Sequence, residues 1–240
     1  MSTDWKKRCK EEWGLQDAPM PDSVDWKSVY EAKPFNRNLL KNPSPYALGQ
    51  EDSRPDEGDQ SDVPPMVPPR RAMCIPGFIE GDFSDWTTST EDLPSDMSRI
   101  PKGAVVCAVP RYSWFTLEQA VDLKAEGLWE ELLDDFQPEI VVQDRYEESH
   151  LHEFIYQLLV KLLGADKTTV IAEYTVTPTE DRGAYSRNHK WKEVSHVFSG
   201  YGPGVRHVHF LHRLKNQFLN GFYTTASSGS SVIVRPMKSP

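Results

Sequence analysis

The sequence predicts an all-β fold: an antiparallel, jelly-roll-like β-sandwich with short helices and a disordered linker rich in proline and acidic residues. Short apolar runs follow one another along the second half of the chain with turn residues between them, which is typical of a sandwich or jelly roll. Residues 154–162 are apolar at every even position, as in a strand with one buried face. Hydrophobic residues make up 38% of the 240 residues and aromatic residues 11%, enough for a sizeable core.

Residues 1–43 form a charged N-terminal segment in which we expect a short helix. In the stretch TDWKKRCKEEW, Trp5, Cys9 and Trp13 are four residues apart and so share one helix face. Thr3 is placed to cap the helix. The spacing therefore predicts a helix whose aromatic face leads into the β domain.

Residues 44–71 are dominated by Pro, Asp, Glu, Ser and Gly, with almost no aliphatic side chains. Such a segment cannot bury enough surface to offset its ordering entropy, so we interpret it as a disordered linker or long loop. Its PPMVPP run also fits a polyproline ligand for an aromatic-lined groove. The β-sandwich is then expected over residues 72–240.

Within that domain, KGAVVCAVP (residues 102–110) predicts a first buried strand. The clearest helical candidate is residues 116–136, which Gly127 interrupts. Residues 154–163 and 168–176 predict an antiparallel hairpin around a Gly-Ala-Asp turn. Further strands are predicted in WKEVSHVFS, VRHVHFLH and SSVIVRP, and the GYGPG stretch between the first two indicates a tight reversal.

Charge and composition exclude several classes of function. The 27 basic and 36 acidic residues give a net charge of −9, the wrong sign for binding nucleic acid or anionic membranes. No apolar signal region and no membrane-spanning run is evident, and Cys9, Cys74 and Cys107 are odd in number and widely spaced. We therefore expect a cytoplasmic protein with reduced structural thiols and no integral membrane span.

Two histidines one residue apart, His207 and His209, raise the question of a metal site. Because Val208 and Phe210 form the apolar pair of this strand, we expect both histidines to face outward. His196 and His212 are assigned to other registers, and no third ligand is evident. A solvated histidine face is thus expected, with no metal and no cofactor.

No catalytic constellation is recognisable. The sequence has no Gly-x-Ser-x-Gly elbow and no phosphate-binding loop. The acidic pairs Glu130–Glu131 and Asp134–Asp135 are expected to solvate the outer face of a helix. The residues alone therefore predict a binding domain that is not an enzyme.

Four stretches together resemble the F-box-associated (FBA) domain family, found in sugar-recognising F-box proteins of ubiquitin ligases. They are PFNRNLLKNP (34–43), AEGLWEELLDDFQPEIVVQD (125–144), WKEVSHVFSGYGPGVRHVHFLH (191–212) and SSVIV (230–234). The resemblance implies an antiparallel, galactose-binding-like β-sandwich in which YGPGVR enters a core strand and carries no metal. Within the family, the chain most resembles a member described as a receptor of non-specific cytotoxic cells.

The resemblance also implies a candidate binding loop. Sugar-binding members hold the chitobiose core of N-glycans on a loop near the C-terminus, with stacked aromatic rings and a lysine. Alignment places Phe218, Leu219 and Asn220 on that loop, with Leu219 at the tryptophan position and Asn220 at the lysine position. A glycan site that is weakened or lost is therefore expected, and hairpin-tip packing is the alternative role for Phe218 and Leu219.

Two functions remain open. The first is a non-catalytic module that recognises a protein or glycoprotein ligand, linked to ubiquitin-dependent glycoprotein turnover such as endoplasmic-reticulum-associated degradation. Docking onto the ligase adaptor is not implied, because the 33 residues before Pro34 are fewer than the roughly forty to fifty of an F-box. The alternative is an innate-immune receptor that binds foreign or antimicrobial ligands at the plasma membrane, attached peripherally or exported non-classically.

Overall fold

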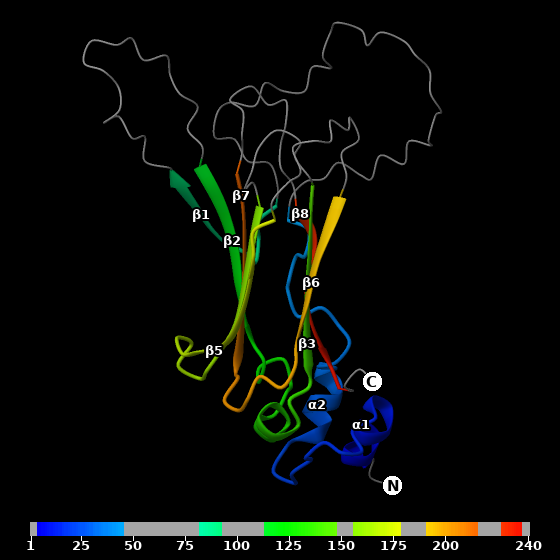
Figure 1. The fold of residues 1–240 in the computed structure, drawn as a ribbon. Coiled ribbons are helices and arrows are strands. Elements are labelled where there is room, and N and C mark those ends of the chain that lie inside the picture. The colour runs from blue at the N-terminus through cyan, green and yellow to red at the C-terminus, as the bar shows by residue number, and fades with distance from the viewer. Residues whose placement is uncertain are drawn as a thin grey trace, which may run out of the picture.

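The computed structural model describes residues 4–45, 82–92, 113–147, 156–178, 191–215 and 227–236, and its strands form two antiparallel layers (Figure 1). The five-stranded sheet has the order β1-β2-β7-β4-β5, and the three-stranded sheet has the order β6-β3-β8. The predicted antiparallel β-sandwich is confirmed. Its strands are β1 (Thr87–Asp92), β2 (Ser113–Asp122), β3 (Glu139–Glu147), β4 (Tyr156–Leu163), β5 (Val170–Val176), β6 (Trp191–Phe198), β7 (His207–Lys215) and β8 (Ser227–Arg235).

The hairpin of β4 and β5 is confirmed, and the burial of β4 alternates as the sequence predicts. The two strands pair antiparallel from Leu158 opposite Val176 onward. The turn closes because the Asp166 carboxylate accepts hydrogen bonds from the backbone N–H groups of Thr168 and Thr169. The inward, buried positions of β4 are Tyr156, Leu158, Val160 and Leu162.

The predicted helix over residues 116–136 is wrong in its first half. Residues up to Asp122 belong to β2, which pairs with β1 on one side and β7 on the other. Leu117 and Val121, both buried, are four residues apart, a spacing that is even and so fits a strand face as well as a helix face. The segment forms a strand because it pairs with a neighbouring strand on each of its two edges. Helical structure in this stretch is confined to residues 130–136, most of which form a short π-helix, η2 (Leu132–Phe136).

The GYGPG stretch is a connection between layers and not a hairpin. It joins β6 of the three-stranded sheet to β7 of the five-stranded sheet. Gly200, Gly202 and Gly204 all have positive φ, between 56° and 98°, which suits glycine. The chain crosses the sandwich at this point.

The predicted N-terminal helix is confirmed as α1 (Trp5–Trp13), with Cys9 fully buried on its inner face. Its cap is Asp4, whose carboxylate accepts a hydrogen bond from the backbone N–H of Lys7, whereas Thr3 lies outside the described residues. Trp5 and Trp13 both contact the ring of Tyr30 on the second helix.

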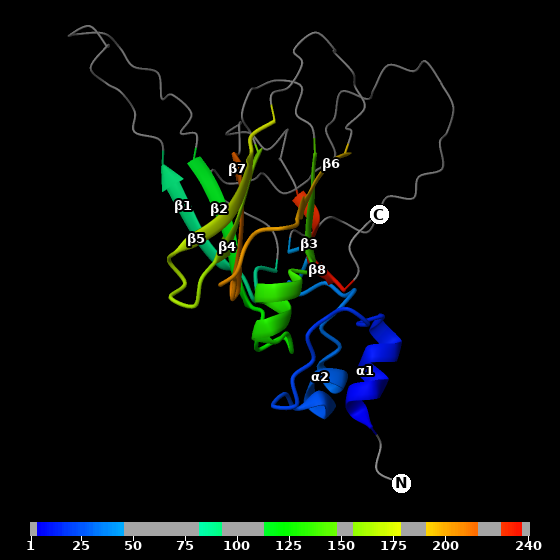
Figure 2. The same cartoon turned by 60° about the horizontal axis from the view of Figure 1, so that its bottom comes forward.

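The second helix, α2 (Trp26–Ala32), fastens the N-terminal segment to the sandwich. Trp26 packs edge-to-face on Trp129, with ring centroids 4.9 Å apart, and Figure 2 shows α1 and α2 beside the helical segment before β3. Residues 36–39 then run along β8, where Leu39 N–H donates to the Val232 carbonyl oxygen. The helices and the sheets share one hydrophobic cluster.

Several sequence predictions concern residues outside the described ranges. The predicted linker is described only for residues 44 and 45, and the predicted strand at 102–110 is not described. Cys74 and Cys107 also lie outside these ranges. Within the described part of the chain, no helix is long and apolar enough to cross a bilayer.

Candidate functional site

Four connections start from the end of the sandwich opposite the helices. They join β1 to β2, β3 to β4, β5 to β6 and β7 to β8, and the strand ends that flank them gather at this end (Figures 1 and 2). Each of the last three links a strand of one sheet to a strand of the other. We call this end of the molecule, defined by the described ends of these eight strands, the loop end.

The predicted glycan-binding residues Phe218, Leu219 and Asn220 belong to the connection 216–226, outside the described residues. The structure places the flanking strands: β7 ends at Lys215, and β8 begins at Ser227 in the opposite layer. The predicted binding loop therefore starts from both layers of the loop end.

Aromatic and basic groups lie on the strands near this end. The Arg213 guanidinium sits 4.6 Å from the ring centroid of Trp114, a cation–π contact. Tyr146 and Tyr156 stack with ring centroids 4.4 Å apart and planes within 7°. The first contact joins two neighbouring strands of the five-stranded sheet, and the second joins the two sheets.

A buried polar network crosses between the layers at the loop end. Asp144 of β3 accepts hydrogen bonds from the hydroxyls of Tyr156 (2.6 Å) and Ser230 (2.9 Å), and His212 Nδ1 lies 2.8 Å from its carboxylate. All four residues are at most 1% exposed. Tyr156 and His212 come from the five-stranded sheet, and Asp144 and Ser230 come from the three-stranded sheet, so one carboxylate joins the two layers.

The protonation state of Tyr156 follows from burial and charge. Burial, and then the charge of Asp144, raise the pKa of Tyr156 well above its usual value of about 10. The phenol therefore stays protonated and donates. With Tyr156, Ser230 and His212 directed at it, the Asp144 carboxylate acts as the shared acceptor.

The network is not a hydrolytic triad, although it contains Ser, His and Asp. Ser227 Oγ lies 3.4 Å from His212 Nδ1, the same ring nitrogen that faces Asp144. A triad needs the serine on one imidazole nitrogen and the carboxylate on the other. Ser227, His212 and Asp144 are moreover all 0% exposed, so no substrate reaches them. The arrangement can join two sheets, but it cannot activate a nucleophile.

Sequence reasoning missed this network because of one error in strand register. The sequence interpretation puts His212 in a different register from Val208 and Phe210, but it shares the inner face of β7 with them, and all three are fully buried. Counting every second residue beyond Phe210 finds it. Asp144 occupies the corresponding inner position on β3, so a carboxylate in an inward alternation was the available signal.

The other histidines follow the prediction in part. His209 faces outward as predicted and lies 2.8 Å from the Glu118 carboxylate on the adjacent strand. His207 is only 7% exposed, so a solvated face is wrong there. It lies between Asp122 of β2 and Leu163 of β4. His196 stacks on Tyr174, and burial lowers its pKa.

The described residues form neither a metal-binding cluster nor a reactive thiol. Among the residues described, no three His, Cys, Asp or Glu side chains form a group that could hold a metal ion. Cys9 is fully buried, its Sγ lies 3.5 Å from the Trp26 carbonyl oxygen, and burial raises the pKa of its thiol to about 11. The predicted structural role of this cysteine is confirmed.

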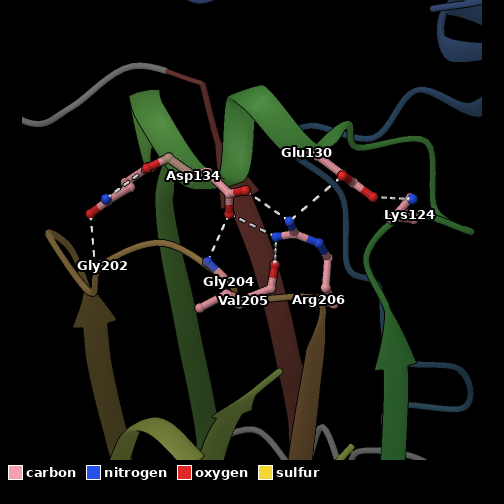
Figure 3. Close-up of polar contacts among 8 residues, drawn as sticks. Lys124, Glu130, Asp134, Gly202, Gly204, Val205 and Arg206 are labelled. Atoms are coloured by element: carbon pink, nitrogen blue, oxygen red, sulfur yellow. Dashed lines mark hydrogen bonds and ion pairs between the residues drawn. The ribbon is translucent and has the colours of Figure 1, made fainter. Parts of the chain in front are cut away.

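At the opposite end of the sandwich, Asp134 and Arg206 form a clamp between η2 and the β6–β7 crossover (Figure 3). The two guanidinium nitrogens of Arg206 each lie 2.8 Å from a carboxylate oxygen of Asp134, a bidentate pair. Gly204 N–H donates to the same carboxylate at 2.7 Å, and Gly202 N–H donates to Gln137 Oε1. The hydrogen bond from Arg206 holds the pKa of Asp134 below its ordinary value.

The clamp corrects the interpretation of the acidic pairs. Asp134 is not a solvating side chain on an outer helix face, because only 28% of it is exposed and it anchors the crossover. Glu130 is half exposed and pairs with Lys124, while it lies 3.9 Å from Arg206. The signal available in the sequence was Arg206, the basic residue that follows GYGPGV.

A family model described as the F-box associated region matches residues 30–234. The chain is 58% identical to F-box only protein 50 of Danio rerio over 240 residues, covering 99% of this chain and 98% of that protein. It is 35% identical to F-box only protein 6 of Bos taurus over 237 residues, covering 96% of this chain and 77% of that protein. These findings do not bear on the finer resemblance to non-specific cytotoxic cell receptor protein 1, which stays a prediction.

Solved structures are more distant. The structure of TmCBM61 in complex with beta-1,4-galactotriose is 11% identical, with a TM-score of 0.35, and the match covers 83% of this chain and 99% of that chain. At this TM-score the likeness carries no information about a ligand of this chain.

Proposed function

The chain belongs to the F-box associated family, and from that premise we propose that it is a non-catalytic recognition module whose ligand-binding surface lies at the loop end. Its ligand is a protein or glycoprotein, and its setting is ubiquitin-dependent turnover in the cytoplasm. The module supplies binding and no chemistry of its own.

One observation carries this proposal. The connection between β7 and β8, which contains Phe218, Leu219 and Asn220, starts in one layer and ends in the other, beside two further connections that do the same. Loops held by a rigid scaffold are where binding residues concentrate. The stacked tyrosines and the Asp144 network support this, because they join the two sheets close to the strand ends from which the connection starts.

The residues of the loop favour weak or absent glycan binding. Sugars bind through aromatic rings against their C–H faces and through fixed polar partners for their hydroxyls. Phe218 retains one ring, but Leu219 offers no stacking surface and Asn220 carries no charge. We therefore propose that the loop binds chitobiose weakly or has turned to a different ligand.

The role in a ubiquitin ligase rests on the family alone. The relatives of this chain are F-box only proteins by name. In the described residues 4–45, the buried apolar side chains of α1 and α2 pack with the sandwich in one cluster.

Binding of the ubiquitin-ligase adaptor is tested by a pull-down from cytosol with the purified chain. Retention of the adaptor supports the ligase role, whereas its clean absence removes that role and leaves the binding role.

The alternative of an innate-immune receptor finds no support in these relatives or in the geometry. It would require the chain to be reached from outside the cell. Protease shaving of intact cells separates the two functions, because a cytoplasmic protein survives the treatment and an exposed receptor does not.

The binding proposal itself is tested by an amide chemical-shift titration with chitobiose and with a trimannosyl-chitobiose glycan. Shifts that cluster at Phe218, Leu219 and Asn220 and vanish in Phe218→Ala support a surviving sugar site. Shifts that cluster instead at the helical end, around α1 and α2, would overturn the placement of the binding surface.

A further inference from the structure

The edges of the two sheets are unequally protected against pairing with another strand. Within the described residues, β8 is covered along its edge by residues 36–39, and β1 is a short strand of polar sequence. The pairing of β5 with β4 shifts register between Leu162 and Leu163, an irregularity that hinders further pairing. The edge of β6 has no such protection. It is a regular strand of eight residues without proline, glycine or a register shift.

The outer edge of β6 combines a regular backbone with an exposed apolar side chain. Among the strands that the structure describes, only β3 pairs with β6. In the same part of the chain, no backbone group of β6 bonds outside its sheet. Val197 of β6 is 41% exposed, and Val170 of β5 is the other exposed large hydrophobic residue among those described. An edge of this kind is a ready template for an additional strand.

The sandwich interior is incompletely covered beside β6. This strand lies opposite β5, because the rings of His196 and Tyr174 stack with centroids 4.2 Å apart. Pairing with β4 places Ala172, Tyr174 and Val176 on the inner face of β5, yet all three are only partly buried. The inner positions of β4, by contrast, are at most 1% exposed. A strand added beyond β6 would cover the open side of the His196–Tyr174 stack.

The side chains of β6 change character from one end of the strand to the other. On its outer face Glu193 lies near the start and Val197 near the end, and on its inner face Lys192 and Phe198 hold the same positions. A second copy that paired antiparallel about the centre of β6 would set Glu193 against Val197 and Lys192 against Phe198. Each charged group would then face an apolar side chain, which disfavours self-pairing. A strand of different sequence avoids this mismatch.

We propose that the outer edge of β6 is a docking site for an extended segment of a partner protein, which pairs antiparallel with β6 as an added strand. Main-chain hydrogen bonds supply the affinity, and the side chains select the sequence. The segment carries apolar residues at its N-terminal end, opposite Val197 and Phe198, and charged residues at its C-terminal end, opposite Lys192 and Glu193. This surface goes beyond the proposed function, because it recognises polypeptide backbone along the side of the sandwich.

The probe is a peptide, capped at both ends, with the sequence Val-Val-Tyr-Thr-Val-Lys-Glu. In the antiparallel alignment its first two valines lie opposite Phe198 and Val197, and its lysine lies opposite Glu193. The control peptide has the same side chains but carries a methyl group on every backbone nitrogen, so it cannot donate to a strand. Each peptide is titrated into the full chain and followed by amide chemical shifts and amide hydrogen exchange.

We expect the first peptide to shift the amides of residues 194–198 and to slow their hydrogen exchange, and the methylated peptide to do neither. Val197→Lys should weaken binding about fivefold, because it places a charge where the segment presents an apolar side chain. The matched control Val170→Lys changes the similarly exposed valine on the edge of β5, 43% against 41%, and should leave binding unchanged.

Absence of any response in the β6 amides at millimolar peptide would overturn the proposal. Equal effects of the two peptides, or of the two valine substitutions, would overturn it as well. Shifts of the β6 amides that depend on protein concentration without peptide would assign this edge to a second copy of the chain instead. Failure of the proposed function is read separately, because the chitobiose titration reports on the loop end and uses no peptide.

Discussion

At the scale of single residues, the hydroxyl of Tyr156 is expected to stabilise the fold more than an ordinary tyrosine hydroxyl does. It donates to a buried carboxylate at 2.6 Å, and hydrogen bonds to charged groups contribute about 1.5–3 kcal/mol. Tyr156→Phe should therefore lower the free energy of unfolding by about 1.5–3 kcal/mol in a urea titration.

Tyr201 supplies the matched control. Its hydroxyl lies 3.0 Å from the Pro138 carbonyl oxygen, a neutral and partly buried acceptor. Tyr201→Phe should cost only about 0.5–1.5 kcal/mol. An equal loss in the two variants would contradict the assignment of Asp144 as a charged acceptor.

Asp134 predicts a pH dependence of stability. Because its pKa is lowered in the folded state, its contribution is present above the ordinary aspartate pKa of about 3.9 and is lost as the pH falls toward the folded value. The stability difference between wild type and Asp134→Asn, measured by urea unfolding, should shrink as the pH is lowered from about 6 to about 3. A stability difference that stays constant over this range would contradict the stabilising role of the ionised Asp134 carboxylate in the clamp.

At the scale of elements, Gly127 lets α2 approach the turn that follows β2. Its φ is 100°, and a Cβ built there would lie 2.8 Å from the Ala32 Cβ. Gly202 has a φ of 88° but no atom within 4 Å of such a Cβ. An alanine at this position therefore measures the backbone strain of a positive φ without any steric clash. Gly202→Ala should lose about 1 kcal/mol and Gly127→Ala clearly more, as measured by thermal unfolding. Equal losses would show that the α2 contact is not tight.

The secondary-structure elements also show which parts of the fold can be predicted from the sequence. Strict alternation predicted the hairpin of β4 and β5, because local turn chemistry and burial agree there. The helix predicted from Thr116 is wrong because a leucine and a valine four residues apart fit both the helical and the strand period. Only the pairing of this segment with β1 and β7 shows that it is a strand. Alternation places Asp144 and His212 on inward faces, but their meeting in one network could not be predicted, since its members come from β3, β4, β7 and β8 and meet through sheet order alone.

At the scale of the whole molecule, the N-terminal helices are part of the domain and not an appendage. Trp26 and Phe35 each pack edge-to-face on Trp129 in the shared cluster, and residues 36–39 run along the edge of β8. Removing residues 1–33 should therefore expose apolar surface and lower the melting temperature. Circular dichroism melting and binding of a hydrophobic dye measure both effects. A truncated chain that melts like the full chain would show that the sandwich is independent of the helices.

The central claim is that the connection between β7 and β8 is the binding surface and that its glycan site has been weakened by two substitutions. The direct measurement is the affinity for chitobiose of the double variant Leu219→Trp/Asn220→Lys, by chemical-shift titration beside the wild type. Restoring the ring and the cation should tighten binding at least tenfold, about 1.4 kcal/mol, and adding Phe218→Ala should reverse the gain. A folded double variant that binds no better than the wild type would contradict the account.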